Sequence, residues 1–590
     1  MYDYRAPRRD MQFVLHEVLA ASDVLARLGR ADMDRETLDS ILEEGARFAE
    51  TVLSPLNVSG DRAGVVVANG VVTEPPGFAA AHRQFVDAGW PAIGADPEFG
   101  GQGLPTLAHL APGEMFVSSA MAWRMCSGLS DGAARAIHKH GTPEQKAAVL
   151  PKLTRGDWTG TMCLTEPQSG TDLGLMRTRA VPDPAGGYRI TGTKIYITWG
   201  DHGMTDNIVH LVLAKLPDAP PGTRGISLFL VPKRIDGAPN GVSCVSVEHK
   251  MGIHGSPTCV MAFENAHGTL IGQPNGGLAC MFTMMNHARL GVGLQGLGLS
   301  ERALQAAYAY APSRLQGRAL VPSGPPEGPA DPITVHPDVR RMLLTLRSLT
   351  EAGRLLAYFV YQLQDVEELS GDEATASHAG ELVAFLVPIV KAFLTDMAME
   401  TTSLAIQVHG GAGFIRDTGV EQYLRDAKIT CIYEGTNGIQ ALDLMGRKLA
   451  LNRGATLAKL IKELSSVLGE DLPEAVRPLA ARFGELLGEW GELTTLVLTR
   501  AGGDANELGA AGADYLAFAG YTLLAWAWLK AAAAAGRGLK GGADRAFYES
   551  KLALAQFYGA RLLPRTLSHA AAVRAGAATL MAEAGLAALA

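Results

Sequence analysis

The chain has 590 residues, of which 47% are apolar and 19% charged, and its formal net charge is −8. A single hydrophobic core rarely extends over such a length, so we expect about three or four domains. The composition is that of an ordinary globular protein and excludes a fibrous or largely disordered one. Nucleic-acid binding is also disfavoured, because neutralising phosphates normally requires a concentrated basic face.

Residues 1–33 form an N-terminal extension. Three arginines near its start would suit a transit peptide, but Asp3, Asp10 and Glu17 lie among them, and transit peptides contain few acids. A short amphipathic helix over residues 11–19 fits the pattern better, and we expect a cytoplasmic protein. We expect no membrane span, because no segment reaches the roughly 18 uninterrupted apolar residues that one requires.

Residues 34–158 carry apolar side chains at helical spacing and are predicted to form a helical domain. Thr142 followed by Pro143 predicts a helix start, since threonine caps helices and proline is favoured at the first helical position. The glycines of residues 99–103 predict a loop between helices.

Between residues 159 and 276 the periodicity changes to that of strands. Residues 188–198, 207–213 and 226–231 are short β-rich runs separated by proline and glycine clusters. This composition predicts a compact antiparallel sheet domain or barrel.

Helical periodicity returns over residues 277–450 and again over residues 451–590. The proline-rich stretch 321–332 is predicted to interrupt the first region as an exposed loop, because proline removes a backbone donor and clashes with the preceding turn. Glycine pairs at 502–503 and 541–542 predict breaks in the second region, an alanine- and leucine-rich bundle. The predicted fold class is therefore α+β and multidomain: an N-terminal helical domain, a middle antiparallel β domain, a helical bundle domain and an additional C-terminal helical bundle.

Two other patterns carry no site. Gly291, Gly293 and Gly296 satisfy the dinucleotide fingerprint G-x-G-x-x-G, but they follow a helical pattern with no βαβ unit around them, so close helix packing explains them better.

The cysteines form no CxxC pair and no zinc-ligand spacing, and are predicted to be buried, reduced thiols. They are Cys126, Cys163, Cys244, Cys259, Cys280 and Cys431.

The chemistry lies in two motifs about 270 residues apart. One is residues 431–440, Cys-Ile-Tyr-Glu-Gly-Thr-Asn-Gly-Ile-Gln, with a lone acid between an aromatic residue and a glycine. The other is residues 164–172, Leu-Thr-Glu-Pro-Gln-Ser-Gly-Thr-Asp. The first resembles the catalytic-base loop of the acyl-CoA dehydrogenase family and the second resembles that family's flavin-contacting loop. The resemblance is richest in motifs from Gly89 to Leu449, and it implies an FAD enzyme that desaturates an acyl-CoA thioester.

The resemblance makes Glu434 the catalytic base. In the family a glutamate removes the pro-R α-proton while the β-hydrogen leaves as hydride to the flavin N5. Burial beside an apolar acyl chain would raise the pKa of such a carboxylate toward neutrality, which suits a general base. The family holds the thioester oxygen with the base residue's own backbone N–H and a flavin ribityl hydroxyl, and one such donor is worth about 3 kcal/mol. Taken alone, Glu434 could equally be a helix-start acid or a surface residue.

The resemblance also implies the cofactor contacts. Thr165 and neighbouring backbone groups would bond the isoalloxazine edge, and Tyr196 and Thr198 would cover the flavin and reach N5, although many relatives have tryptophan at the tyrosine position. Arg314 would reach the FAD pyrophosphate across a dimer interface. A guanidinium suits a diphosphate because it can donate two parallel hydrogen bonds. Gln316 lacks the phenylalanine that usually accompanies it, and His409 is expected to be structural. The implied set is Cys163, Leu164, Thr165, Thr171, Tyr196, Thr198, Arg314, Gln316, Gln407, Gly411, Thr436 and Gly438.

Five residues are implied to contact the substrate. Asn286 and Arg289 match a pair at the CoA end of the site, where relatives often have aspartate and arginine, and Arg289 suits an anionic tail. Lys250 would take a CoA phosphate or would be an ordinary solvated charge. The implied set is Thr171, Asn286, Arg289, Gly435 and Lys250.

The leading interpretation is FAD-dependent oxidation of an acyl-CoA to a trans-2-enoyl-CoA, with electrons passed to an electron-transfer flavoprotein. An acyl-CoA oxidase would share the base and the flavin, so this alternative stays open. A DNA-associated relative would need a basic tract, which the C-terminal region lacks.

The opening residues 1–7 and the tail resemble a bacterial branch that includes 3-methylmercaptopropionyl-CoA dehydrogenases. This favours oxidation of 3-methylthiopropionyl-CoA to methylthioacryloyl-CoA, with medium or long straight chains as the alternative. In related enzymes an extra C-terminal bundle occupies the face used for tetramer formation, so we expect a homodimer.

Overall fold

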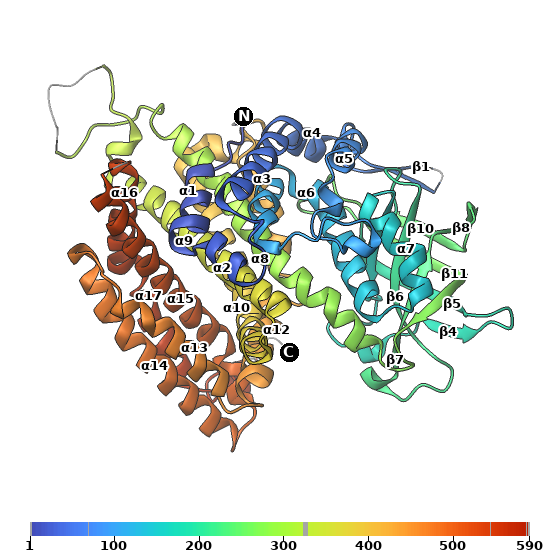
Figure 1. The fold of residues 1–590 in the computed structure, drawn as a ribbon. Coiled ribbons are helices and arrows are strands. Elements are labelled where there is room, and N and C mark those ends of the chain that lie inside the picture. The colour runs from blue at the N-terminus through green and yellow to red at the C-terminus, as the bar shows by residue number, and fades with distance from the viewer. Residues whose placement is uncertain (1–2, 69, 322–327, 543, 586, 588–590) are drawn as a thin grey trace. The chain divides into compact units, whose positions relative to one another are not determined.

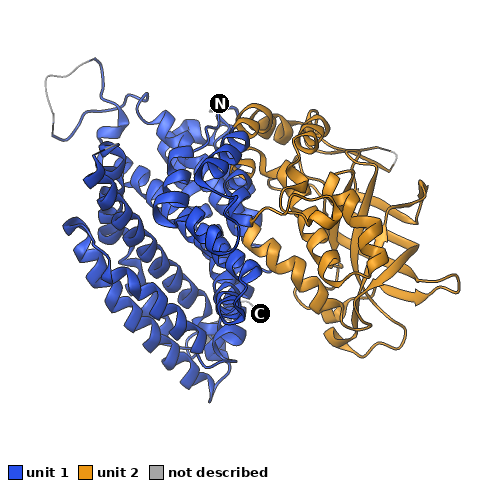
Figure 2. Cartoon of the chain, in the orientation of Figure 1, with its two compact units in different colours: residues 1–46, 106–114, 292–590 blue, residues 47–105, 115–291 orange. Residues whose placement is uncertain are grey.

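The computed structural model describes residues 3–68, 70–321, 328–542, 544–585 and 587. The chain divides into two compact units (Figures 1 and 2). Unit 1 contains residues 1–46, 106–114 and 292–590, and unit 2 contains residues 47–105 and 115–291. Helices precede and follow one central run of strands along the chain, which confirms the predicted α+β, multidomain fold class.

Unit 2 begins with helices that flank a small hairpin of strands β1 and β2. The helix α7 starts as predicted: the Thr142 hydroxyl accepts a bond from the Gln145 N–H, and the Gln145 side chain accepts one from the Thr142 N–H. Pro143 occupies the first helical position, where its missing N–H costs nothing. The elements are α4 (Ser54–Ala63), β1 (Val66–Ala68), β2 (Val71–Thr73), α5 (Phe78–Asp87), α6 (Thr106–His140, in unit 2 from Met115) and α7 (Pro143–Arg155).

The middle of unit 2 is a seven-stranded sheet in the order β10-β11-β5-β4-β6-β3, with β7 paired to both β11 and β6. Five strands therefore form a closed ring, as expected for a barrel. The strands are β3 (Trp158–Cys163), β4 (Arg179–Pro182), β5 (Tyr188–Thr198), β6 (Asn207–Lys215), β7 (Ile226–Pro232), β10 (Val242–Val247) and β11 (Thr258–Ile271); β8 (Arg234–Ile235) and β9 (Ala238–Pro239) form a separate ribbon.

The prediction of an antiparallel sheet is only partly correct. The strand β3 pairs with β6 in parallel, from Trp158↔Asn207 to Cys163↔Val212. The two strands are not consecutive in the chain, so no tight turn forces them to run in opposite directions. The strand β6 is buried along nearly its whole length. Its residues alternate between two core clusters, with Leu211 packing in the cluster of α6 and α7 and Val212 in that of β5 and β11.

Unit 1 is helical. Its C-terminal bundle breaks where the glycine pairs predicted, since α14 ends at Ala501 and α15 ends at Gly541. Figure 1 shows α13, α14, α15 and α17 lying side by side. The helices are α1 (Arg8–Gln12), α2 (Ala21–Arg27), α3 (Arg35–Phe48), α8 (Gly277–Tyr310, in unit 1 from Val292), α9 (Pro337–Leu369), α10 (Glu373–His409), α11 (Glu421–Thr430), α12 (Asn437–Asp443), α13 (Ala455–Ser465), α14 (Arg477–Ala501), α15 (Asn506–Gly541), α16 (Arg545–Phe557) and α17 (Arg565–Ala575).

The predicted packing role of the glycine fingerprint is confirmed for Gly293 and Gly296 but not for Gly291, which has no atom within 4 Å of a built Cβ. A Cβ built on Gly293 would lie 2.8 Å from Val390, and one on Gly296 would lie 2.6 Å from the Leu394 carbonyl. Both glycines belong to α8 and both neighbours to α10, so the small residues allow two helices to approach closely. The proline-rich loop is only partly visible, because residues 322–327 lie outside the described residues.

Among the residues that the structure describes, two helical segments are long and apolar enough to cross a membrane by length and composition alone: Glu373–Phe414 and Asn506–Gly541. Their apolar windows are 83% and 89% buried within the protein. Helices that are apolar on all sides and covered by other helices are core helices of a large domain.

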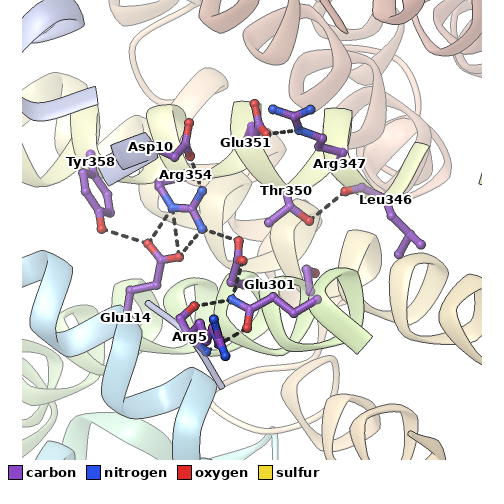
Figure 3. Close-up of polar contacts among 12 residues, drawn as sticks. Arg5, Asp10, Glu114, Glu301, Leu346, Arg347, Thr350, Glu351, Arg354 and Tyr358 are labelled. Atoms are coloured by element: carbon purple, nitrogen blue, oxygen red, sulfur yellow. Dashed lines mark hydrogen bonds and ion pairs between the residues drawn. The ribbon is translucent and has the colours of Figure 1, made fainter. Parts of the chain in front are cut away.

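The N-terminal extension is anchored in unit 1 by a buried ionic network (Figure 3). The predicted helix forms as α1 followed by a π-helical turn, Phe13–Val18. Asp10 binds the Arg354 guanidinium, which also binds Glu114 at 2.7 Å and Glu301 at 2.6 Å. Arg354 is fully buried, so these carboxylates must neutralise it.

Candidate active site

The base loop, residues 431–436, joins α11 to α12 in unit 1. Glu434 and Gly435 both have left-handed backbone conformations, with φ of 56° and 85°. This conformation is ordinary for glycine but is strained for glutamate, and such strain persists only where neighbouring groups enforce it.

Two side chains hold the strained backbone in place. The Gln440 amide donates to the carbonyl of Glu434 at 3.1 Å and to that of Gly435 at 3.2 Å. The Lys391 ammonium, from α10, donates to the same Gly435 carbonyl at 2.9 Å. The peptides on both sides of Gly435 are thus fixed by groups from two helices.

The start of α12 is tied to α10 through Asn437. Its amide donates to Thr395 Oγ1 at 2.9 Å and to Asp396 Oδ1 at 2.8 Å, and its oxygen accepts from Lys391 at 2.8 Å. Thr436 caps α12 by accepting the Ile439 N–H at 3.3 Å. The Thr436 and Gly438 surfaces are exposed, as a contact with a cofactor would require.

The aromatic residue before Glu434 faces α8. Tyr433 donates a hydrogen bond from its hydroxyl to Gln295. Burial raises the pKa of Tyr433, and the nearby charge of Glu434 raises it further, so the phenol stays protonated and remains a donor. Glu434 itself is half-buried.

The flavin loop, residues 164–172, follows β3 in unit 2 and is fastened to β5. The fully buried Lys194 donates to the Leu164 carbonyl at 2.9 Å and to Glu166 at 2.8 Å, and the Ile195 N–H donates to the Thr165 carbonyl at 2.9 Å. Burial alone would raise the pKa of Glu166, but the Lys194 charge and several hydrogen bonds lower it to about 2. The backbone of the loop is therefore fixed, while Thr171 at its end is exposed.

Tyr196 lies at an irregularity of β5. The pairing with β11 shifts between Lys194 and Ile197, and Tyr196 has a left-handed φ of 59°. A bulge of this kind redirects a side chain away from its neighbours. The Tyr196 side chain is 59% exposed, and Thr198 is half-buried two residues further along.

The segments of Arg314 and Gln407, both predicted to contact FAD, meet at one end of unit 1. Tyr310, the last residue of α8, stacks on His409 with ring centroids 4.3 Å apart. The Arg314 N–H bonds the Tyr310 carbonyl at 3.2 Å, so the arginine leaves the helix directly beside the turn at residues 407–411. His409 is buried and its Nδ1 contacts the Ala405 carbonyl at 2.7 Å, which supports its predicted structural role. Arg314, Gln316, Gln407 and Gly411 are all exposed.

The three remaining substrate candidates lie in unit 2. Asn286 is exposed on α8, and Arg289, one turn later, is buried with its guanidinium 5.9 Å from the Phe282 ring centre. The Lys250 ammonium donates to the Ser256 carbonyl at 2.9 Å and so holds a turn. This role in a turn differs from both predicted ones, a ligand of a CoA phosphate or an ordinary solvated charge.

Sequence reasoning missed the two lysines that hold the loops. Lys391 lies in an otherwise apolar run of α10, and Lys194 occupies an inward-facing position of a predicted strand. A charged residue at a position whose neighbours in the pattern are buried is the signal that could have found both, because burying a charge is costly unless it has a specific partner.

Four protein-family models match successive parts of the chain. The acyl-CoA dehydrogenase N-terminal, middle and C-terminal domain models match residues 35–157, 161–266 and 275–449, and an acetyl-CoA dehydrogenase C-terminal-like model matches residues 455–583.

Relatives match over almost the whole length. The chain is 42% identical to the 3-methylmercaptopropionyl-CoA dehydrogenase of Ruegeria pomeroyi, covering 95% of this chain and 96% of that protein. It is 34% identical to a broad-specificity linear acyl-CoA dehydrogenase of Mycobacterium tuberculosis, covering 96% of each. A solved acyl-CoA dehydrogenase from Bacillus anthracis, complexed with FAD, shares the fold with a TM-score of 0.73 at 21% identity, over 92% of this chain and 89% of that one. The predicted family is thereby confirmed: the chain belongs to the acyl-CoA dehydrogenases, oxidoreductases that bind FAD and act on acyl-CoA thioesters.

Proposed function

We propose that Glu434 is the general base that removes the α-proton of the acyl-CoA, leaving a trans-2-enoyl-CoA as product. FAD, when bound, supplies the acceptor for the β-hydrogen, which leaves as a hydride. The assignment rests on the strained φ of 56° at Glu434. The carbonyls of this loop accept hydrogen bonds from side chains of two helices. Strain that the surroundings enforce is typical of a residue whose orientation matters for chemistry. The Glu434 N–H would then hold the thioester oxygen, where charge develops as the proton leaves.

The residues of unit 2 fit the flavin ring. Tyr196 presents a largely exposed aromatic face, which can stack on an isoalloxazine, and Thr198 places a hydroxyl on the same strand. The fixed loop backbone at Leu164 and Thr165 and the exposed Thr171 would also contact the flavin, and Asn286 and Arg289 would contact the CoA tail. Thr436 and Gly438 would contact the cofactor from the base loop.

The residues of unit 1 fit a diphosphate. Arg314 and Gln407 are exposed and lie on segments joined by the stack of Tyr310 on His409. An exposed guanidinium next to a glycine turn suits pyrophosphate oxygens. We assign both segments, with Gln316 and Gly411, to the FAD of a partner subunit.

A homodimer follows from this assignment. Large apolar side chains are exposed next to the two segments, which is unusual for a surface that faces only water. They are Leu315 at 43%, Leu320 at 82%, Val321 at 84%, Phe414 at 86% and Ile415 at 55% exposed. Light scattering on the purified protein should give the mass of two chains, and Phe414→Glu should shift the protein toward monomer and lower its FAD content.

The acyl group we favour is 3-methylthiopropionyl, because the relative that carries this name is 42% identical over 95% of the chain. Straight acyl chains are the competing class, since the relative at 34% identity is described as acting broadly on linear substrates.

We further propose an electron-transfer flavoprotein as the oxidant and a cytoplasmic location. We also propose domain boundaries after residues 33, 158, 276 and 450, and the extents of the matching family models support these boundaries.

An anaerobic titration with a panel of acyl-CoAs tests the proposal. The panel pairs 3-methylthiopropionyl-CoA with pentanoyl-CoA, which has a methylene in place of the sulfur, and adds octanoyl- and palmitoyl-CoA. We expect bleaching of the flavin absorbance, strongest with the thioether. Equal bleaching by pentanoyl-CoA would remove the thioether preference, and rapid peroxide formation in air would favour the oxidase. A protein that retains FAD but is bleached by no thioester would refute the proposed function.

A further inference from the structure

The base loop depends on a buried cation that has no part in the reaction proposed above. Lys391 is fully buried in α10, and its ammonium donates to the Gly435 carbonyl at 2.9 Å and to Asn437 Oδ1 at 2.8 Å. Both of these acceptors are uncharged, and Asn437 in turn donates to the Asp396 carboxylate at 2.8 Å, on which the Lys391 charge also acts. Burying an ammonium is costly unless it has specific partners. Here those partners include the backbone of the base loop.

The bonds converge on the residue that follows the base. A left-handed glutamate is stable only if the peptides around it are fixed, because an extended or helical φ would lie lower in energy. Lys391 and Gln440 together bond the Gly435 carbonyl, and Gln440 also bonds that of Glu434. The direction of the Glu434 side chain and of its N–H therefore follows from these bonds.

The anchor for the ammonium is itself rigid. Asn437 bonds Lys391, Thr395 and Asp396, which all lie on the same face of α10 within two turns. The packing of α8 against α10 at Gly293 and Gly296 adds further constraint to this helix. Lys391 thus connects a fixed helix to the loop at one backbone atom.

We propose that Lys391 is the positioning residue of the catalytic base: by holding the Gly435 carbonyl it keeps Glu434 in the left-handed conformation that aims its carboxylate at the substrate α-carbon. The inference rests on the proposed role of Glu434. It assigns to Lys391 an effect on proton removal and none on cofactor or substrate affinity.

The test compares Lys391→Met with wild type by anaerobic stopped-flow measurement of flavin reduction. Methionine keeps the length and apolar character of the side chain but cannot donate. We expect the maximal reduction rate to fall about 10- to 100-fold, with FAD content and the apparent Kd for the acyl-CoA unchanged. The isotope effect from an α-deuterated substrate should rise, because proton removal becomes more fully rate-limiting; a merely structural loss would lower FAD content and leave the isotope effect as it was.

Lys551→Met is the matched control. Lys551 is also a fully buried lysine of unit 1, but it binds Asp10 and Glu351. We expect this variant to lose stability and to keep the wild-type reduction rate in its folded fraction. If it slows reduction as much as Lys391→Met does, the effect belongs to any buried lysine and the inference is overturned.

Gln440→Met decides the question if Lys391→Met does not fold, because Gln440 holds the same carbonyl with no charge. A slower reduction with a raised isotope effect supports the positioning role, and a wild-type rate overturns it. The proposed function fails separately: a wild-type protein that no acyl-CoA reduces refutes both, whereas an active wild type with an equally active Lys391→Met refutes only the inference.

Discussion

A buried lysine bonds a backbone carbonyl in each of the two candidate loops, but the charge of the lysine's second partner differs. In the flavin loop Lys194 bonds the Leu164 carbonyl and the carboxylate of Glu166. In the base loop Lys391 bonds the Gly435 carbonyl and the neutral amide of Asn437. The flavin loop is therefore held by an ion pair and the base loop by dipoles, although both lysines are fully buried.

The difference has a chemical reason. A carboxylate bonded directly to the base loop would disfavour the ionised base. Lys391 bonds the loop through neutral atoms, and the Asp396 carboxylate lies one bond further away, on Asn437. The flavin loop carries no proton in the proposed reaction and can use a carboxylate. The comparison predicts that damage to the base loop lowers the reaction rate, and that damage to the flavin loop lowers cofactor retention and stability.

The largest effect should come from Glu434→Gln. Glutamine fills the same space but cannot accept the α-proton, so we expect flavin reduction to slow by about 10³-fold or more, with FAD still bound. Stopped-flow reduction by the best acyl-CoA of the panel measures it. Glu421→Gln, which removes a carboxylate paired with Arg425 on α11, is the control and should reduce normally. A Glu434→Gln enzyme that reduces its flavin at the wild-type rate would remove the base assignment.

Lys194→Met should mainly affect unit 2. It leaves Glu166 buried without its cation, which typically costs about 3–5 kcal/mol when one partner of a buried pair is removed. We expect a lower Tm and loss of FAD on gel filtration. In Lys194→Met/Glu166→Gln both charges are gone, so part of the stability should return. Retention of FAD and Tm by Lys194→Met would mean that the ion pair does not hold the flavin loop.

Gly520→Ala should disturb the base loop from the C-terminal bundle. A Cβ on Gly520 of α15 would lie 2.1 Å from the ring of Phe393, which neighbours Lys391 on α10. Overpacking of this kind costs about 1–3 kcal/mol, so we expect a lower free energy of unfolding and slower reduction. Gly509→Ala, on the same helix with open space around it, should be neutral or slightly stabilising. Equal behaviour of the two variants would contradict tight α10–α15 packing.

The smallest expected effect concerns acid stability. The pKa of Glu166 is about 2 in the folded protein against an ordinary value of 4.5, so its ionised form is stabilised by folding. This contribution is fully present above pH 4.5 and is lost as the pH falls through about 2. Urea unfolding at several acidic pH values should show that Glu166→Gln loses less stability on acidification than wild type. Parallel curves for Glu166→Gln and wild type would refute the ion-pair description.

Local signals in the sequence determined the elements they predicted. Thr142 and Pro143 specify the start of α7 through their own hydrogen bonds and φ, and β5 covers residues 188–198 as its β-rich pattern predicted. The breaks near residues 502 and 541 follow from glycine's poor helix propensity. These features need no knowledge of the rest of the chain.

What could not be predicted depends on residues far apart in sequence. The parallel pairing of β3 with β6, the bulge at Tyr196 and the anchoring of residues 434–437 by Lys391 each join segments separated by dozens of residues. Glu434 is proposed as the base because the residues around it resemble those of a family. Its strained backbone leaves no mark in composition or periodicity.

The central claim is that Glu434 removes the α-proton, and exchange of that proton tests it without hydride transfer. A 3-thia-acyl-CoA has sulfur in place of the β-carbon and so cannot be oxidised. We would follow loss of its α-proton signal by NMR in D₂O with wild-type holoenzyme and with Glu434→Gln. If Glu434 removes the proton, wild type catalyses the exchange and the variant does not. Equal exchange by both enzymes would contradict this claim and assign the proton to another base.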